Sequence, residues 1–174
     1  MGLLSKHETI AHRLEFAAAP GALFNTFTDP QHGNALFGTK AFAILHGTPG
    51  APGSMMVRAI YETAPLARHV PLLAATPEVQ AQLRIALALQ PHRVSSEASM
   101  GGITQKSEIK FLPQGSGTLM TFDSSYAVPL HLRAFAGGMR SLFSERIIAA
   151  FTRLAELSAD APALRRLQQG VLRP

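Results

Sequence analysis

The sequence predicts an α+β protein in which an antiparallel β-sheet packs against one long C-terminal helix. The first observation is a series of short alternating segments between residues 9 and 128, and the second is an amphipathic stretch over residues 132–157. The third is composition, since 174 residues with 47% hydrophobic and 16% charged side chains suit one folded core and are too few for two. We therefore expect a single domain over residues 1–174, with a core in residues 9–157 and a tail in residues 158–174.

The first elements are a strand and two short helices. In residues 9–16 apolar side chains alternate with polar ones, which is typical of a strand with one wet face. Pro20 suits the first position of a helix, and Asp29-Pro30 ends that helix because proline cannot continue it. A second helical turn is expected over residues 30–38.

The middle of the chain is expected to form two strands and then a helical insert. The strands are predicted at residues 40–46 and 54–62, with a loop rich in glycine and proline between them. Residues 66–92 depart from the β pattern. Thr-Pro-Glu at positions 76–78 supplies the cap hydroxyl, the proline and the acidic side chain of a helix start, and the residues after it are rich in alanine, leucine and glutamine.

Three further strands and the long helix complete the predicted fold. The strands are expected at about residues 92–100, 103–112 and 117–128. The tail after the helix is expected to fray or to form a short extra helix. At about 100° per residue, one broad face of the helix is apolar and collects Leu132, Phe135, Ala136, Met139, Leu142, Phe143, Ile147, Ala150, Phe151, Leu154 and Leu157.

Charge is concentrated near the C-terminus. The chain has 16 Lys and Arg against 11 Asp and Glu, a net charge of +5, and residues 131–174 hold seven of the arginines against three acidic side chains. No run of five basic residues interleaved with aromatics is present, so we expect no specific nucleic-acid partner. No apolar stretch reaches the roughly 20 residues of a membrane span, and the first residues do not resemble a signal peptide. A cytoplasmic location is expected.

The sequence excludes several kinds of chemistry. It contains no cysteine, so disulfides, thiolate metal sites and cysteine nucleophiles are excluded. The spacings HExxH, 2-His-1-carboxylate, GxSxG and GxGxxG are also missing. We expect no metal and no cofactor, and an enzyme with this sequence would depend on cavity shape and one or two polar groups.

Four segments together carry a family resemblance. They are the opening strand followed by Ala19-Pro20, the helix with Leu-Phe-Asn-Thr-Phe-Thr-Asp-Pro at 23–30, the turn Phe-Leu-Pro-Gln-Gly-Ser-Gly-Thr at 111–118, and the terminal helix. With these segments the chain resembles the START/polyketide-cyclase-like (SRPBCC) superfamily over most of residues 9–157. The sequence departs from the superfamily pattern at residues 66–92, where a tight strand-to-strand connection would be expected.

The resemblance implies the helix-grip fold, a curved antiparallel sheet wrapped around a long C-terminal helix. It also implies an apolar cavity between sheet and helix, which in this superfamily binds lipids, quinones, polyketides or other hydrophobic small molecules. The ten phenylalanines and six methionines of the chain suit such a cavity, since methionine adapts to ligands of different shape.

Alternation predicts which side chains face that cavity. One face of the last strand would present Met120, Phe122, Ser124, Tyr126 and Val128. The matching face of the preceding strand would present Ile103, Gln105, Ser107, Ile109 and Phe111. The polar members of both sets are candidates to orient a ligand, unless they satisfy one another or a buried water. Other inward-facing or lining candidates are Tyr61, His12, His46, Phe135, Met139 and Phe143.

A few titratable side chains are candidates for chemistry. Arginines border the apolar face of the long helix, and Arg140 or Arg146 could bind a ligand carboxylate or phosphate in a bidentate contact. The alternative for both is an ordinary salt bridge or a solvated position. Tyr126 and His46 are the candidates for a general acid or base.

Three functions stay open at this point. The first is binding or transport of a hydrophobic small molecule, and the second is a cofactor-independent cyclase or dehydratase acting on an aromatic or polyketide-like substrate. The third is an interaction module or lipid chaperone for a membrane enzyme, which would bring peripheral membrane contact. The insert at 66–92 could serve as a lid over the cavity or as a dimer interface, so both a monomer and a homodimer are compatible with the sequence.

Overall fold

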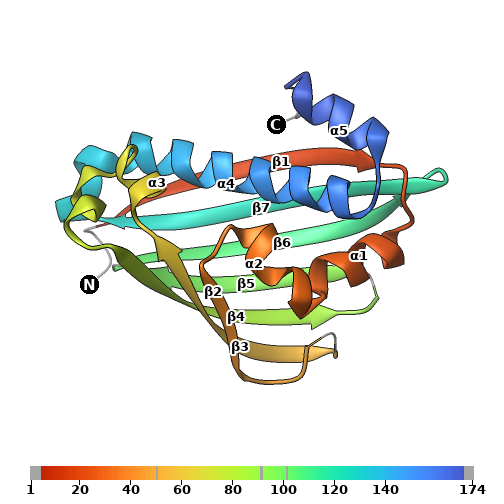
Figure 1. Ribbon diagram of the computed structural model, residues 1–174, viewed down its shortest axis with the longest axis horizontal. Coiled ribbons are helices and arrows are strands. Elements are labelled where there is room, and N and C mark those ends of the chain that lie inside the picture. The colour runs from red at the N-terminus through yellow and green to blue at the C-terminus, as the bar shows by residue number, and fades with distance from the viewer. Residues whose placement is uncertain (1–4, 50, 91, 101, 171–174) are drawn as a thin grey trace.

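A seven-stranded antiparallel sheet forms the framework of the protein (Figure 1). The structure is a computed structural model that describes residues 5–49, 51–90, 92–100 and 102–170. Its strands are β1 (Ser5–Phe16), β2 (Ala41–His46), β3 (Gly53–Glu62), β4 (Glu78–Ala88), β5 (Arg93–Met100), β6 (Ile103–Gln114) and β7 (Gly117–Pro129). Their order in the sheet is β1-β7-β6-β5-β4-β3-β2. The sheet is thus a meander from β2 to β7, with the first strand paired to the last.

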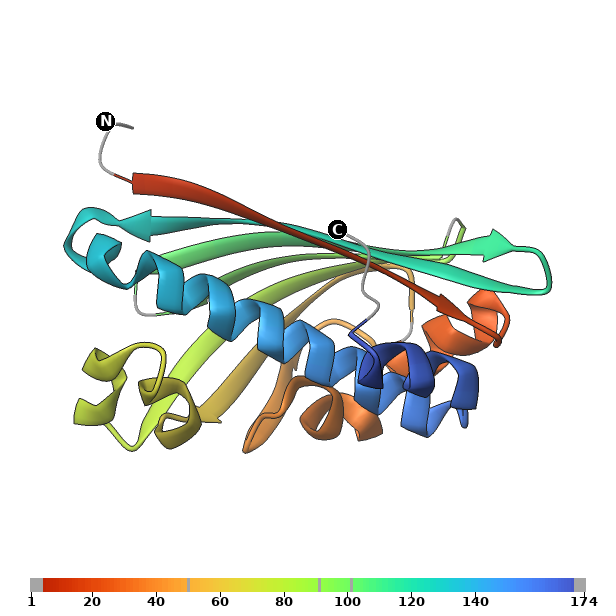
Figure 2. The same ribbon diagram turned by 90° about the horizontal axis from the view of Figure 1, so that it is seen from above.

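The helices lie on one side of this sheet (Figure 2). The α-helices are α1 (Pro20–Thr28), α2 (Gly33–Phe37), α3 (Ala64–Ala67), α4 (Ala136–Leu157) and α5 (Ala161–Gln168). Three short 3-10 helices accompany them, η1 (Pro30–His32), η2 (Pro71–Ala75) and η3 (Leu130–Phe135). The α+β class, the two short helices after the first strand and the long C-terminal helix are confirmed. The α-helical part of the long helix begins at Ala136, because the residues before it form the tighter η3.

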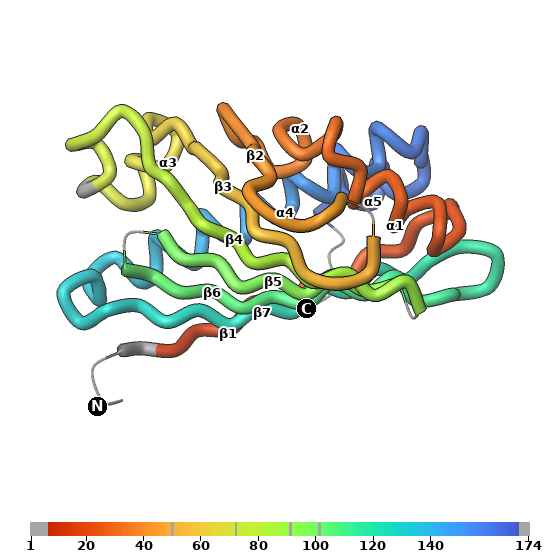
Figure 3. Tube along the Cα trace, turned by 90° about the horizontal axis from the view of Figure 1, so that it is seen from below, coloured from red at the N-terminus to blue at the C-terminus, as the bar shows by residue number. Residues whose placement is uncertain are grey.

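The sheet is strongly curved around α4. Figure 3 shows β1, β7, β6 and β5 as one layer, from which β4, β3 and β2 curl up to the level of the helices. This curvature follows from the right-handed twist that neighbouring strands accumulate across a wide sheet. One face of α4 is therefore enclosed by strands and by α1 and α2.

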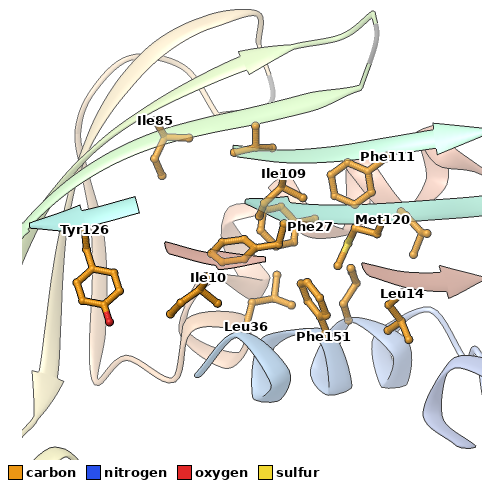
Figure 4. Packing of buried hydrophobic residues seen from close by; sticks show 14 of the residues in the cluster. Ile10, Leu14, Phe27, Leu36, Ile85, Ile109, Phe111, Met120, Tyr126 and Phe151 are labelled. Atoms are coloured by element: carbon orange, nitrogen blue, oxygen red, sulfur yellow. The ribbon is translucent and has the colours of Figure 1, made fainter. Parts of the chain in front are cut away.

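Aromatic and aliphatic side chains of α4 pack against the concave face of the sheet at β7 and β1. Phe151 on α4 meets Phe122 on β7 edge to face, with ring centroids 6.5 Å apart. Figure 4 shows Phe151 among Phe27, Phe111 and Met120, whereas Ile85 and Tyr126 lie apart from that group. Burial follows the predicted alternation, since the inward-facing side chains of β7, from Met120 to Val128, are all buried. The inward faces predicted for β6 and β7 are confirmed.

The helical insert predicted over residues 66–92 is wrong for most of its length. Only α3 and η2 are helical there, and residues 78–88 form β4, which pairs with β3 and β5 along its length. In β4 apolar Ala81, Leu83, Ile85 and Leu87 alternate with exposed polar or small residues. This period of two fits a half-buried strand, and pairing on both sides overrides the helix-forming tendency of its alanine, leucine and glutamine. The chain does lack a tight strand-to-strand connection here, but over fewer residues than expected, because the β3–β4 connection spans residues 63–77.

This connection approaches the start of α4 very closely. A Cβ atom added to Gly138 would lie 2.1 Å from the carbonyl oxygen of His69. The imidazole of His69 and the guanidinium of Arg68 also contact the Glu145 carboxylate, at 3.0 and 3.4 Å. Gly138 therefore permits the connection to dock on the helix, because any larger residue would push the two backbones apart.

The C-terminal tail forms α5 and is fixed to the first strand. The buried carboxylate of Asp160 caps α5 by accepting a hydrogen bond from the Ala163 amide at 3.0 Å. It also accepts hydrogen bonds from the amides of Ala17 and Ala18, which follow β1. Since three backbone donors converge on one side chain, Asp160 ties the two ends of the fold together.

The two neighbouring glycines of α4 should respond to alanine in opposite ways. Gly138→Ala should lower the free energy of unfolding by about 1–3 kcal/mol, because the new Cβ overlaps the His69 carbonyl. Gly137 has no atom within 4 Å of an added Cβ, so Gly137→Ala should be neutral or raise stability by up to about 1 kcal/mol through helix propensity. Urea denaturation of both variants measures this, and equal effects would contradict the close docking.

Asp160→Ala should lower the free energy of unfolding by roughly 2–3 kcal/mol, since it removes a helix cap and leaves buried amides without an acceptor. Ser158→Ala is the matched control at the same junction. The buried Ser158 hydroxyl has no hydrogen-bond partner in the described part of the chain, so its loss should change stability little. Thermal denaturation compares the two variants, and a loss in the control as large as that in Asp160→Ala would refute the special role of the carboxylate.

Candidate functional site

A cavity of about 160 Å³ lies between α4 and the concave face of the sheet. The strands contribute Tyr61, Ala81, Leu83, Ile85, Val94, Ser96, Ala98, Met100, Ile103, Gln105, Ser107, Ile109 and Phe122 to its wall. The helices and the β3–β4 connection contribute Phe27, Phe37, Leu66, Leu142, Phe143, Arg146, Ile147 and Ala150. Apolar side chains dominate this wall. The cavity lies in the concave face of the curved sheet, where side chains of β4, β5 and β6 and those of α4 leave space between them.

About half of the predicted ligand-binding residues line this cavity. Those that do are Gln105, Ser107, Phe122, Tyr61, Phe143 and Arg146. Those that do not are Met120, Ser124, Tyr126, Phe135, Met139 and Arg140. Met120 and Met139 are buried in the packed core, Phe135 belongs to η3, and Arg140 is exposed. A strand residue must therefore face the helix to line the cavity, but not every strand residue that faces the helix does so.

The predicted polar groups of the sheet wall bond to one another. Ser107 shares a hydrogen bond of 2.7 Å with Ser96 on the neighbouring strand. Gln105 donates to the Ser124 hydroxyl at 2.9 Å, and that hydroxyl donates to the carbonyl of Lys106 at 3.2 Å. These pairs satisfy groups that would otherwise be costly to bury. The structure therefore shows the alternative in which the polar side chains of this wall hydrogen-bond to one another.

His46 does not point toward the helix, contrary to the expectation from alternation. The β2–β3 pairing shifts register between Ile44 and His46, so that Ile44 opposes Val57 while His46 opposes Met56. This bulge adds one residue to β2 and moves every later side chain to the other face of the sheet. His46 is exposed as a result, and this removes it from the concave face.

Tyr126 is buried but lies beside the cavity. Its ring contacts Phe143 with centroids 4.9 Å apart, and its hydroxyl has no hydrogen-bond partner among the described residues. Burial raises the pKa of the Tyr126 phenol, and the nearby Glu8 raises it further, while Arg140 opposes this shift. A phenol with a raised pKa is poorly placed to act as a base near neutral pH.

His12 faces the helix as expected, at a distance from the cavity. His12 lies on β1 opposite Phe122 of β7, and its Nε2 lies 3.1 Å from the Ser144 hydroxyl of α4. Burial lowers the pKa of His12, which favours the neutral imidazole. The contact therefore joins β1 to α4 as a neutral hydrogen bond.

Arg146 is the charged group of the cavity wall. Its Nη1 donates a hydrogen bond of 3.0 Å to the carbonyl oxygen of Phe37, and its Cζ lies 4.4 Å from the centre of the Tyr61 ring. Burial lowers the pKa of Arg146 and raises the pKa of Tyr61, and the charge of each partly offsets the shift of the other. The guanidinium is thus held between a carbonyl and an aromatic face.

The β3–β4 connection covers one end of the cavity. Leu66 of α3 is buried and lines the wall, and the residues after it dock on α4 through His69 and Gly138. Sequence reasoning missed the lining residues of β4, such as Leu83 and Ile85, because β4 was expected to be helical, and it missed Val94 of β5 because no face of that strand was assigned to the cavity. The alternating apolar residues of β4 were the signal that could have found Leu83 and Ile85.

Comparisons with known proteins agree on the fold. No protein-family model matches the chain, and no curated protein sequence is similar to it. Among solved structures, the Zhui aromatase/cyclase from a Streptomyces species has a TM-score of 0.69 at 12% identity, covering 93% of this chain and 96% of its own. The chain has the helix-grip fold.

Two other helix-grip structures are similar to it. Norcoclaurine synthase from Thalictrum flavum, in complex with dopamine and hydroxybenzaldehyde, has a TM-score of 0.65 at 15% identity and covers 90% of this chain and 89% of its own. Ara h 8.0201 has a TM-score of 0.61 at 12% identity and covers 89% of this chain and all of its own, 100%. The expected likeness to the START/polyketide-cyclase-like superfamily is confirmed at the level of the fold.

Two other kinds of functional feature are missing from the described residues. No group of three or more His, Asp or Glu side chains in them is arranged to hold a metal ion. None of their helices combines the length and hydropathy needed to cross a bilayer.

The ionisation of Tyr61 should report on Arg146. The chain has two tyrosines and no tryptophan, so in Tyr126→Phe the tyrosinate absorbance follows Tyr61 alone. Because burial raises the pKa of Tyr61 and Arg146 lowers it, the native midpoint should lie above that of the urea-unfolded protein and rise further in Arg146→Met. The stability contributed by the neutral phenol should be complete below about pH 10 and lost as the pH rises through the folded pKa. Arg153→Met is the control, and an equal shift there would contradict the pairing.

Proposed function

We propose that this helix-grip protein binds a small hydrophobic molecule in the cavity between α4 and strands β4 to β6. The observation that carries the proposal is the unfilled space of about 160 Å³ inside an otherwise closely packed core. Protein interiors normally leave few voids larger than a water molecule. An apolar cavity of this size lowers stability unless something occupies it, so its persistence is best explained by a ligand.

The volume supports a ligand, or an enclosed part of one, with a single ring or a short branched chain. Apolar cavities of about 150 Å³ hold one benzene-sized molecule. A lipid, quinone or polyketide would place only part of its structure there, unless the β3–β4 connection moved. The similar norcoclaurine synthase structure holds dopamine and hydroxybenzaldehyde, and this supports a one-ring aromatic ligand for the present cavity.

Binding is favoured over a cyclase or dehydratase activity by the chemistry of the wall. Among the described residues that line it, the titratable ones are Tyr61 and Arg146, and no imidazole or carboxylate is present. Both expected acid or base candidates, Tyr126 and His46, lie outside the cavity. General acid–base catalysis needs a group of suitable pKa within hydrogen-bond reach of the substrate, and the wall offers none near neutral pH.

The docking of the β3–β4 connection favours a cover over a dimer interface. Leu66 contributes to the cavity wall, and His69 and Gly138 bring the backbones of the connection and α4 together. The face of the connection that carries Leu66 is therefore used within one chain. We propose that ligand entry requires movement of this segment.

Filling the cavity with a side chain should abolish binding. In Ala98→Phe the new ring would enter the cavity next to Leu83 and Gln105, which lie opposite Ala98 on the neighbouring strands, so affinity for toluene should fall at least tenfold. Ala86→Phe is the matched control, because Ala86 is exposed on the outer face of the sheet and its replacement leaves the cavity open. Titrations followed by methyl chemical shifts of Ile85 and Ile109 measure binding. Equal affinity in wild type and Ala98→Phe would show that toluene binds elsewhere.

Native mass spectrometry of freshly purified protein tests the same proposal without a chosen probe. A co-purified small molecule in the wild type that is missing from Ala98→Phe would identify the natural ligand class. If no ligand co-purifies and toluene does not shift the cavity methyl groups, the binding proposal fails.

A further inference from the structure

The cavity contains a cation without an anion. Arg146 is its one formally charged wall residue in the part of the chain that the structure describes. It forms no ion pair with an acidic side chain among those residues. A half-buried charge that lacks a counter-ion carries a desolvation cost that an ordinary structural arginine avoids by pairing or by reaching water.

The nearest acidic residue in the sequence is already engaged elsewhere. Glu145 directly precedes Arg146 but is exposed, and its carboxylate contacts Arg68 and His69 of the β3–β4 connection at 3.4 and 3.0 Å. Successive residues of a helix point in directions about 100° apart, so Glu145 turns toward the connection while Arg146 faces the cavity. The Glu145 carboxylate therefore pairs with the connection and forms no ion pair with Arg146 in the described part of the chain.

The contacts of Arg146 orient it without using all its donors. A guanidinium has five N–H groups, and the described residues supply one hydrogen bond, from Nη1 to the Phe37 carbonyl at 3.0 Å. The Cζ atom of Arg146 lies 4.4 Å from the centre of the Tyr61 ring. The remaining N–H groups of the guanidinium are donors of the kind that a carboxylate accepts in pairs.

Arg146 differs from the serine and glutamine side chains that the sheet contributes to the wall. Ser96 bonds to Ser107, and Gln105 bonds to Ser124, so these side chains already have partners. Arg146 is the charged group of the wall, and its one hydrogen bond among the described residues leaves further N–H donors for a ligand. A ligand with one polar end would gain most by placing that end at Arg146.

We propose that the cavity selects a small monocarboxylic acid, with the carboxylate bound by Arg146 and an apolar ring or short branched chain enclosed by Ile85, Val94 and Ile109. This inference rests on the proposed binding function and adds the polar end of the ligand. A single cation matches a single negative charge, which favours a carboxylate over a doubly charged phosphate. The planar fork of arginine also fits a carboxylate through two parallel hydrogen bonds.

Three probes of similar size test the inference. They are phenylacetate, its neutral isostere phenylacetamide, and toluene, each titrated at neutral pH by calorimetry and by the methyl shifts of Ile85 and Ile109. Wild type should bind phenylacetate at least tenfold more tightly than phenylacetamide. Arg146→Met should remove this preference and retain toluene binding, and Arg146→Gln should do the same while keeping an amide donor near Phe37.

Arg153→Met is the matched control. Arg153 lies on the same helix but is exposed and contacts Glu156 at 2.5 Å, so its replacement should leave the preference for phenylacetate unchanged. Toluene binding in each variant shows whether the cavity is intact.

The outcomes separate the two proposals. If wild type binds toluene but does not prefer phenylacetate, or if Arg146→Met and Arg146→Gln keep the preference, the carboxylate inference is wrong and the binding function stands. If none of the three probes binds wild type in the cavity, the binding function itself fails. A preference that is lost in both Arg146 variants, and kept in Arg153→Met, supports the inference.

Discussion

The structure depends on one constraint: a single sheet must bury the apolar face of a single helix. Strands β1 and β7 lie close enough to α4 for side chains to interlock, as Phe122 and Phe151 do. The sheet reaches around the helix only by curving, and on the concave face it leaves space between α4 and strands β4, β5 and β6. Side chains on both surfaces are apolar but no longer meet, so the same geometry that forms the core on one side leaves the cavity on the other. The cavity is a consequence of the fold, and its wall residues determine what it can hold.

The two sides of the cavity wall differ in how their polar groups are paired: those of the sheet hydrogen-bond to one another, whereas the charged group of the helix has no counter-ion among the described residues. Polar residues that a strand places on the concave face have neighbours on adjacent strands, and Ser96, Ser107, Gln105 and Ser124 use them. On α4 the positions three and four residues from Arg146 hold Leu142, Phe143, Ala149 and Ala150, whose side chains cannot accept a hydrogen bond. Arg146 consequently finds its partners on other elements, the carbonyl of Phe37 and the ring of Tyr61. Neither partner carries a negative charge.

Most of the fold could be predicted from periodicity, and the errors have local physical causes. The strands with strict alternation and the long amphipathic helix were found because burial imposes their periods. β4 was mistaken for a helix since Thr-Pro-Glu at 76–78 imitates a helix start, and its pairing with β3 and β5 is a long-range effect that composition does not reveal. His46 was misplaced by a single bulge, which reverses the faces of a strand without leaving a mark in the pattern. The site was half predictable: alternation identifies the residues that face the helix, but the distance between sheet and helix decides which of them line a cavity.

The placement of Arg146 is better explained by binding than by stability. Burying a guanidinium costs free energy that a carbonyl and an aromatic ring return only in part. An apolar residue of similar length at this position would fill the space without that cost. The same contacts, however, hold the guanidinium in one orientation, so a carboxylate that reaches it would lose less conformational entropy on binding than at a freely rotating side chain. Because the surrounding wall is apolar, the electrostatic attraction would also be less screened than at the surface. A charge that weakens the empty protein and strengthens the occupied one is what a specific anion site requires, and this asymmetry leads us to place the polar end of the ligand at Arg146.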